Sequence, residues 1–143
     1  MNVHQEIDRV FQVEIDTLVK VRQALNEQYT RAVEMLFACS GKVVVTGMGK
    51  SGLVAQKIAS TMVSTGTLAI FLHPSDGMHG DVGIVQKGDV VLAVSKSGET
   101  EDLLNVLLYV GNIGVPVISL TAKPESAMAK ASTLVLYTPV DQE

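Results

Sequence analysis

The sequence has no tryptophan, only one cysteine and few aromatic residues of any kind. Its lone cysteine, Cys39, cannot form a disulfide within the chain, and it cannot hold a structural zinc ion by itself. The formal net charge of −4 argues against a general role in binding nucleic acid or a membrane surface, because both need a basic face.

Long apolar runs are also absent. The longest ones have the length of a β-strand, which is too short to cross a membrane. The N-terminus carries Glu6 and Asp8 where a secretory signal needs a basic and then an apolar stretch. We therefore expect a cytoplasmic protein, and 143 residues suggest one main domain.

Residues 3–38 have a helical pattern. Apolar side chains recur there at steps of three and four residues, which is typical of an amphipathic helix. The polar patch at residues 26–28 can divide the segment into two helices, and Gly41 fits a helix stop. The apolar stripe consists of Val3, Ile7, Val10, Phe11, Ile15, Leu18, Val21 and Leu25.

After Gly41, short apolar runs alternate with helical stretches. The runs are apolar along their whole length, which indicates strands of a parallel sheet covered on both faces. We predict an α/β fold with a doubly wound, five-stranded parallel sheet in the flavodoxin-like order 2-1-3-4-5. The expected strands are 43–46, 68–72, 90–94, 115–120 and 133–137, and the expected helices between them are 52–65, 101–113 and 125–131.

Polar and glycine-rich segments follow the strands, at the ends where ligands of such folds bind. The first strand is followed by residues 47–52 and the third by residues 95–100, and each segment opens a helix. Backbone N–H groups at a helix start suit a phosphate group, and hydroxyl groups add neutral donors. We expect a phosphomonoester to bind there, held by Ser51, Ser95, Ser97 and Thr100. Residues 73–89 form an unusually long connection, of a kind that is often functional.

The stretch K-V-V-V-T-G-M-G-K-S-G at residues 42–52 leaves other interpretations to weigh. A nucleotide-binding P-loop needs a glycine five positions before Gly49, and Val44 stands there. Gly47, Gly49 and Gly52 fit the dinucleotide fingerprint, which also needs an acidic residue at the end of the second strand. No carboxylate follows that strand until Asp76. Dinucleotide binding and a purely structural turn stay open as weaker alternatives.

The chain resembles the sugar isomerase (SIS) domain, and more narrowly the arabinose-5-phosphate isomerases of the KpsF/GutQ/KdsD group. S-K-S-G-E-T at residues 95–100 is similar to SIS domains in general. G-M-G-K-S-G at 47–52, together with H-P-S-D-G-M-H-G-D-V-G at 73–83, narrows the resemblance to this group. Further matching segments are S-T-G-T at 64–67 and T-A-K-P-E-S-A-M-A-K-A-S at 121–132.

The resemblance implies interconversion of D-ribulose 5-phosphate and D-arabinose 5-phosphate, a homotetramer, and a pair of CBS modules after the SIS domain. It divides the chain into a helical segment at 1–40, packed on the domain or on a partner subunit, and a sugar-phosphate-binding SIS domain at 41–143. We expect more of the SIS domain to follow Glu143, because the last strand would otherwise lack a covering helix. Non-catalytic sensing of a sugar phosphate, or another SIS isomerase acting on a heptose or hexulose phosphate, stays open as an alternative.

The resemblance also assigns catalytic residues. Lys50 is expected to stabilise the enediolate or to contact the phosphate. Asp102 stands where the group has a glutamate, so Glu99 or Glu101 could fill that role instead, and all three could simply supply charge at a helix start. The other expected catalytic groups are Glu143, our preferred base, and His79.

His73 and His79 flank the long connection, and the resemblance implies that both contact the substrate. No cofactor is expected to be required, although His73 is a candidate ligand for an inhibitory zinc ion. Alternatively, both histidines could only shape the loop. The remaining substrate-binding residues implied by the resemblance are Gly66 and Thr67 of the S-T-G-T segment.

Overall fold

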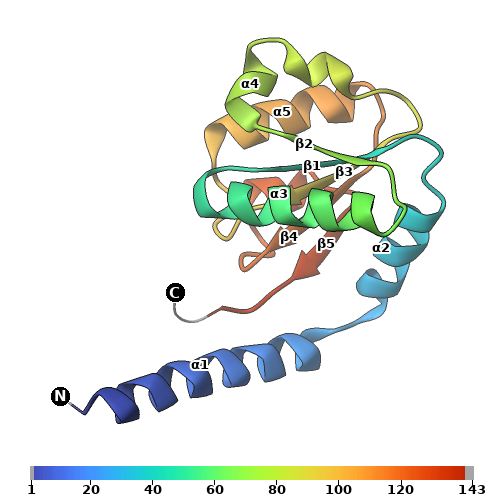
Figure 1. Cartoon of the computed structure of the whole chain (residues 1–143). Helices are drawn as coiled ribbons and strands as arrows, with labels where there is room; N and C mark the ends of the chain where they lie inside the picture. Colours follow the sequence, from blue (N-terminus) through green and yellow to red (C-terminus); the bar gives the residue numbers. More distant parts are fainter. Residues whose placement is uncertain (1, 141–143) are drawn as a thin grey trace.

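A computed structural model describes residues 2–140. Helices and strands alternate after two N-terminal helices (Figure 1). In chain order they are α1 (Val3–Ala24), α2 (Glu27–Phe37), β1 (Val43–Gly47), α3 (Gly49–Ser64), β2 (Ala69–Leu72), α4 (Pro74–Met78), the 3₁₀ helix η1 (Asp81–Ile84), β3 (Val90–Val94), α5 (Glu101–Asn112), β4 (Val117–Thr121), α6 (Ala127–Lys130) and β5 (Leu134–Tyr137).

The strands form one parallel sheet in the order β2-β1-β3-β4-β5, which confirms the predicted topology. β1 lies between β2 and β3, where Val43 pairs with Ala69 on one side and with Val90 on the other. All strands begin at one edge of the sheet, called here the amino edge, and end at the opposite one, the carboxyl edge. The loops that follow the strands therefore gather at the carboxyl edge.

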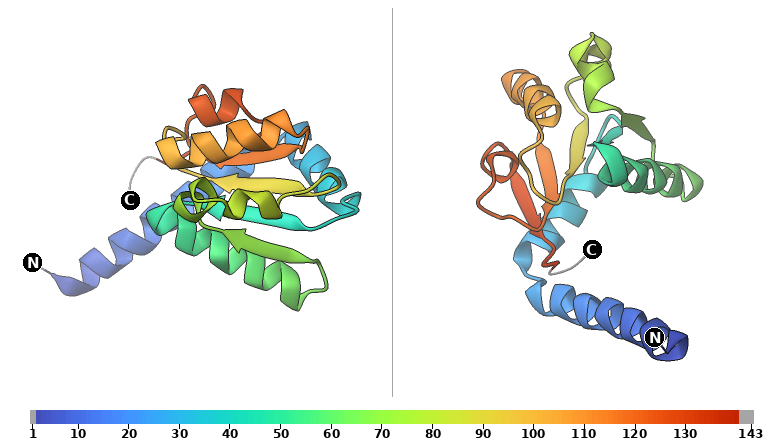
Figure 2. Two further views of the ribbon diagram at one scale, coloured as in Figure 1. Left: turned by 90° about the horizontal axis from the view of Figure 1, so that it is seen from above. Right: turned by 90° about the vertical axis from the view of Figure 1, so that its left-hand side faces the viewer.

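Helices cover both faces of the sheet (Figures 1 and 2). Val43 and Val45 belong to the core beneath α2 and α3, whereas Val44 belongs to the core beneath α5. This division follows from the alternation of side chains along a strand. Both faces of the sheet pack against helices, which explains why apolar residues predominate on both faces of each strand.

The N-terminal segment forms two helices, as its polar patch predicted. The break falls at Leu25 and Asn26, and the Asn26 side chain caps α2 by accepting a hydrogen bond of 2.9 Å from the Gln28 N–H. α2 packs on the domain through Ala32, which is buried, and through a hydrogen bond of 2.7 Å from the Tyr29 hydroxyl to the Tyr137 carbonyl. α1 has no buried residue, and it extends away from the rest of the chain (Figures 1 and 2).

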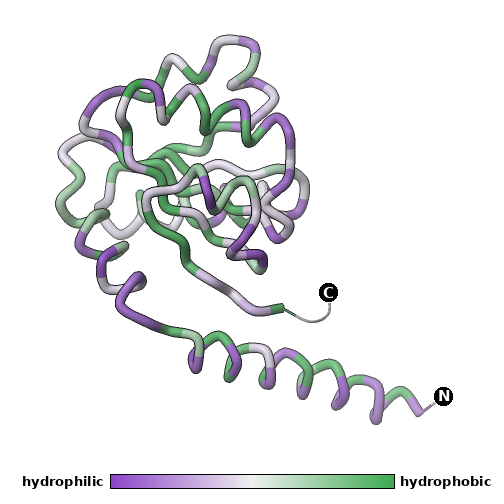
Figure 3. Tube along the Cα trace, turned by 180° about the vertical axis from the view of Figure 1, so that it is seen from behind, coloured by the Kyte–Doolittle hydropathy of each residue, from purple (hydrophilic) through white to green (hydrophobic). Residues whose placement is uncertain are grey.

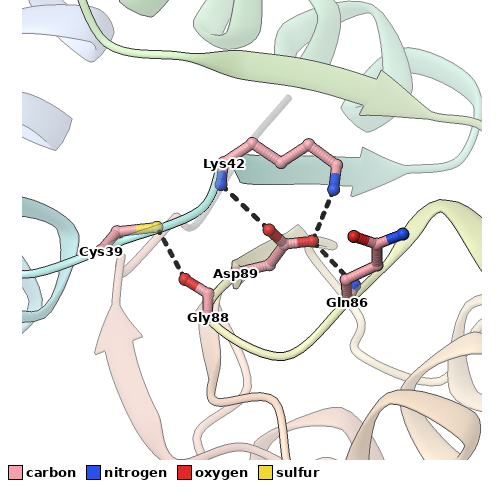
Figure 4. A network of polar contacts seen from close by, with 5 residues as sticks. All are labelled: Cys39, Lys42, Gln86, Gly88 and Asp89. Carbon is pink, nitrogen blue, oxygen red and sulfur yellow. Dashed lines mark hydrogen bonds and ion pairs between the residues drawn. The ribbon is translucent and has the colours of Figure 1, made fainter.

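A buried carboxylate ties β1 to β3 at the amino edge (Figure 4). Asp89 is 3% exposed. Its Oδ1 accepts the Lys42 backbone N–H at 3.0 Å, and its Oδ2 accepts the Lys42 ammonium at 2.7 Å and the Gln86 N–H at 2.8 Å. Burial by itself raises the pKa of Asp89, but these hydrogen bonds and the Lys42 charge outweigh it, so the pKa lies below its ordinary value.

The long connection at residues 73–89 has more structure than the sequence predicted. Pro74 fits the first position of α4, because its fixed φ suits a helix start. Gly80 has a φ of 117°, which glycine adopts easily, and separates α4 from η1. The connection is thus a folded segment that packs beside α5 rather than an open loop. No helix in the described part of the chain is both long and apolar enough to cross a membrane.

Candidate active site

Glycines bring the start of α3 against β1 and β3 at the carboxyl edge. A Cβ at Gly47 would lie 2.8 Å from the Val94 carbonyl oxygen, and a Cβ at Gly52 would lie 2.7 Å from the Gly47 carbonyl oxygen. Both distances are too short for any side chain. Gly49 has a φ of 58°, which L-residues rarely adopt. The glycines of the 47–52 turn are therefore required by its tight packing, with no need for a dinucleotide.

This turn presents Lys50 and Ser51 in the first turn of α3. Lys50 is exposed and Ser51 is half-buried. The residue before the helix is Met48, which supplies no side-chain cap. The first N–H groups of α3 are therefore not capped by a side chain of that residue, and the positive end of the helix dipole faces the carboxyl edge.

The second helix-opening turn, residues 95–100, is held in shape by its own serines. Ser95 is buried, and its Oγ accepts the Gly98 N–H at 3.0 Å. The Ser97 Oγ is exposed and accepts the Glu99 N–H over a longer 3.4 Å. Thr100 precedes α5 and makes no side-chain cap bond. Two helix starts without side-chain caps thus lie at the carboxyl ends of β1 and β3, which are neighbours in the sheet.

Gly98 fixes the 95–100 turn against α6. It has a φ of 67°, and a Cβ there would lie 2.6 Å from the Cβ of Ser126. Its carbonyl accepts the Met128 N–H at 3.0 Å. The Glu99 Oε1 also accepts the Ala127 N–H, at 3.0 Å. These contacts with α6 hold the turn in place. Ser97, which lies before Gly98 in the turn, is exposed to solvent.

The three acidic residues near the start of α5 point to different partners. Glu99 binds the backbone of α6, as described above, and Glu101 is exposed. Asp102 is half-buried, and its Oδ2 accepts a hydrogen bond of 2.6 Å from the Ser75 hydroxyl of α4. Among these three, Asp102 is the one that the structure directs toward the 73–83 segment, the same segment that carries both histidines.

His73 and His79 lie at the two ends of α4. His73 precedes the helix and is half-buried, with its ring edge-to-face against Phe71 at 6.2 Å between centroids. His79 follows the helix and is exposed. In the described part of the chain, no group of three or more histidine, cysteine or acidic side chains could hold a metal ion. His73 and its described neighbours alone therefore do not make a zinc site.

Not every residue proposed from the sequence joins this site. Gly66 and Thr67 lie between α3 and β2, at the amino edge, where they border a pocket with Phe37 and Leu68. The structure does not bring them together with the 47–52 and 95–100 turns. Glu143 lies outside the described residues, so its place relative to the site stays a prediction.

Two polar residues near the carboxyl edge escaped the sequence analysis. One is Ser75, through its bond to Asp102. The other is Thr46, whose hydroxyl is fully buried and has no hydrogen-bond partner within residues 2–140. The sequence does contain a signal for Thr46, because a threonine inside an otherwise apolar strand indicates a buried hydroxyl near the strand end. The role of Ser75 had no such signal, because it depends on how α4 packs against α5.

Comparisons with protein families and with solved structures both relate this chain to SIS-domain proteins. The model of the SIS domain family matches residues 36–143. A structure of Escherichia coli CFT073 c3406 in complex with arabinose 5-phosphate superposes with a TM-score of 0.86 and is 36% identical, covering 100% of this chain and 78% of that one.

Two curated relatives are both named arabinose 5-phosphate isomerase KdsD. The one from Pseudomonas aeruginosa is 42% identical over 100% of this chain, and the one from Escherichia coli K12 is 42% identical over 94% of it. The chain spans 46% of the first relative's length and 41% of the second's. The similarity therefore covers nearly the whole chain but less than half of either relative.

Proposed function

The chain belongs to the SIS domain family, and we propose that it carries the sugar-phosphate site of an isomerase that interconverts D-ribulose 5-phosphate and D-arabinose 5-phosphate. The observation that carries this proposal is the pair of helix starts at neighbouring strand ends, with Lys50 on one and Asp102 on the other. The relatives named for this reaction and the structure in complex with arabinose 5-phosphate support the choice of sugar.

The phosphate group of the sugar is the part that these helix starts suit. N–H groups at the starts of α3 and α5 can donate to its oxygens, and the two helix dipoles favour its negative charge. The exposed Ser97 hydroxyl, Ser51 and Thr100 can add further donors. The Ser95 oxygen already accepts the Gly98 N–H, so this serine mainly shapes the turn while its hydroxyl hydrogen stays available.

The chemistry moves one hydrogen between two carbons. A base removes a proton from C1 of ribulose 5-phosphate, and the electron pair passes to the C2 carbonyl oxygen to give an enediolate. The O1 hydroxyl then passes its proton to the C2 oxygen, and the proton held by the base is returned to C2 as the C1 carbonyl of the aldose forms. No atom is gained or lost, and no electron acceptor is needed.

In this scheme, the Lys50 ammonium stabilises the negative charge on the enediolate oxygens. The Asp102 carboxylate and the His79 imidazole exchange protons with the substrate, and His73 contacts it. Glu143 remains the preferred base of the proposal, and the described residues do not include it. An inhibitory zinc ion at His73 would need ligands besides those described, so no step is assigned to a metal.

The isomerase proposal is tested by incubating the full-length protein with ribulose 5-phosphate and identifying the aldose by NMR. We expect arabinose 5-phosphate to form. Ribose 5-phosphate as the product would contradict the proposed sugar. Binding of the ketose phosphate without turnover would instead identify a non-catalytic sensing module.

Ser97→Ala is expected to raise KM for the phosphorylated sugar with a smaller effect on kcat. A charge-assisted hydrogen bond to phosphate contributes roughly 1.5–3 kcal/mol, which corresponds to a rise in KM of about tenfold or more. Ser60→Ala, at an exposed position farther along α3, serves as the control and should leave KM unchanged. An unaltered KM in the Ser97 variant would remove this serine from the phosphate site.

We also propose that α1 packs on another copy of the chain, within a homotetramer built as a dimer of dimers. Along α1, hydrophobic residues recur turn after turn on one side of the Cα trace (Figure 3), and Phe11, which belongs to this stripe, is 61% exposed. A contiguous exposed stripe of this kind usually marks a protein interface. The curated relatives and the proposed sugar give no information on this point, so the stripe itself supports it.

Light scattering of the purified protein at tens of micromolar should give the mass of an oligomer. Phe11→Glu should shift the mass toward the monomer, because a charge in the middle of the stripe opposes its burial. Gln12→Glu, on the polar side of the same helix, should leave the mass unchanged. A monomeric wild-type protein would contradict the tetramer and the role of α1 in it.

A further inference from the structure

We propose that Ser75 is a positioning residue, which orients the Asp102 carboxylate for proton transfer in the isomerase reaction. The inference rests on the proposed function. It concerns a residue of the β2–β3 connection that the resemblance does not assign to the reaction, and a contact that joins two helices far apart in the sequence.

The hydrogen bond between the two side chains is short. The Ser75 Oγ lies 2.6 Å from the Asp102 Oδ2, within the range for a hydroxyl that donates to a charged carboxylate. Such bonds are stronger and more directional than bonds between neutral groups. A single bond of this kind can therefore fix the plane of a carboxylate that would otherwise rotate freely about its last torsion.

The backbone on both sides of the contact is held in place. Ser75 is in the first turn of α4, and Asp102 is in the first turn of α5. The two helices pack closely, because a Cβ at Gly77 of α4 would lie 2.8 Å from Cγ2 of Val106 on α5. Both residues are half-buried, so solvent competes less for the bond than it would at the surface.

The bond uses only one of the two carboxylate oxygens. The Asp102 Oδ1 has no hydrogen-bond partner within residues 2–140. One lone pair of Oδ2 is engaged by the serine, so we assign proton exchange with the substrate to Oδ1. Ser75 thereby determines which oxygen acts and in which plane its lone pairs lie.

The test compares three variants of the full-length protein in the ribulose 5-phosphate assay. Ser75→Ala should lower kcat by roughly tenfold, the loss of one charge-assisted hydrogen bond, with KM within about twofold of the wild-type value. Ser75→Thr keeps the hydroxyl and should restore most of kcat. Val106→Ala loosens the same helix contact without touching the carboxylate, and it should lower the melting temperature more than Ser75→Ala but kcat less.

Three results would overturn the proposal. They are an unchanged kcat in Ser75→Ala, a failure of the threonine to restore it, and an equal loss of kcat in Val106→Ala, since that would make packing the cause. A wild-type protein that does not isomerise the substrate would overturn the isomerase assignment and this inference together. If the wild-type protein isomerises the substrate and Ser75→Ala has the same kcat, only this inference is overturned.

Discussion

Lys50→Ala is expected to lower kcat by roughly 100- to 1,000-fold, the typical loss when one donor to a developing oxyanion is removed. Lys50 stands in the first turn of α3, at the carboxyl edge where the sugar is proposed to bind. Its charge matters most when the enediolate forms, and much less while the carbonyl of the bound ketose is still uncharged. KM should therefore change little, and the loss should be seen in kcat measured under saturating ribulose 5-phosphate.

Lys57→Ala is the matched control for this substitution. Lys57 is another exposed lysine of α3, two turns farther along the helix, and its removal should leave kcat unchanged. If Lys50→Ala raised KM and left kcat intact, the lysine would be a phosphate-binding residue. The enediolate would then need another source of positive charge.

Asp89→Asn is expected to lower the free energy of unfolding by about 3 kcal/mol, as for other buried ion pairs that lose one partner. The carboxylate accepts three hydrogen bonds, from the Lys42 N–H, the Lys42 ammonium and the Gln86 N–H. An asparagine has only one acceptor oxygen, so its amide group must face at least one of these donors. Urea unfolding at neutral pH and at one fixed protein concentration measures the difference.

The pH dependence of that difference gives a second check. The pKa of Asp89 is lower in the folded chain than its ordinary value of 3.8, so ionised Asp89 stabilises the fold. This contribution is complete above pH 3.8 and is lost as the pH falls through the lower native pKa. The gap between wild type and Asp89→Asn should therefore narrow below pH 3.8, and Glu125→Gln, at an exposed site, should show no such gap.

The fold was predictable because its signals are local and repeat along the chain. Five predominantly apolar runs of strand length indicate strands covered on both faces, and right-handed crossovers between them leave few possible orders. The break between α1 and α2 was also visible, since Asn26 is a good helix cap. The sequence could not show the helices within residues 73–89, because that segment is too short and too polar to have a clear period.

The site was predictable in part. Topology placed the 47–52 and 95–100 turns at one edge, and the same rule places Gly66 and Thr67 at the other, since each crossover helix returns the chain to the amino edge. A role for Gly66 and Thr67 in substrate binding stays a prediction. The choice among Glu99, Glu101 and Asp102 could not be made from the sequence, and the catalytic role of Asp102 stays a prediction. It depends on side-chain directions set by α6 in one case and by α4 in the other.

The Asp89 network and the proposed site occupy opposite edges of the sheet, separated by the length of a strand, about 16 Å for five residues. Free-energy effects of substitutions that far apart usually add. A change in substrate preference acquired at the 47–52 or 95–100 turn can thus be offset by a tighter network around Lys42, without either edge altering the other. In evolution or in directed selection, this geometry allows a change of substrate specificity at one end of the sheet and a compensating gain in folding stability at the other to be acquired in separate steps.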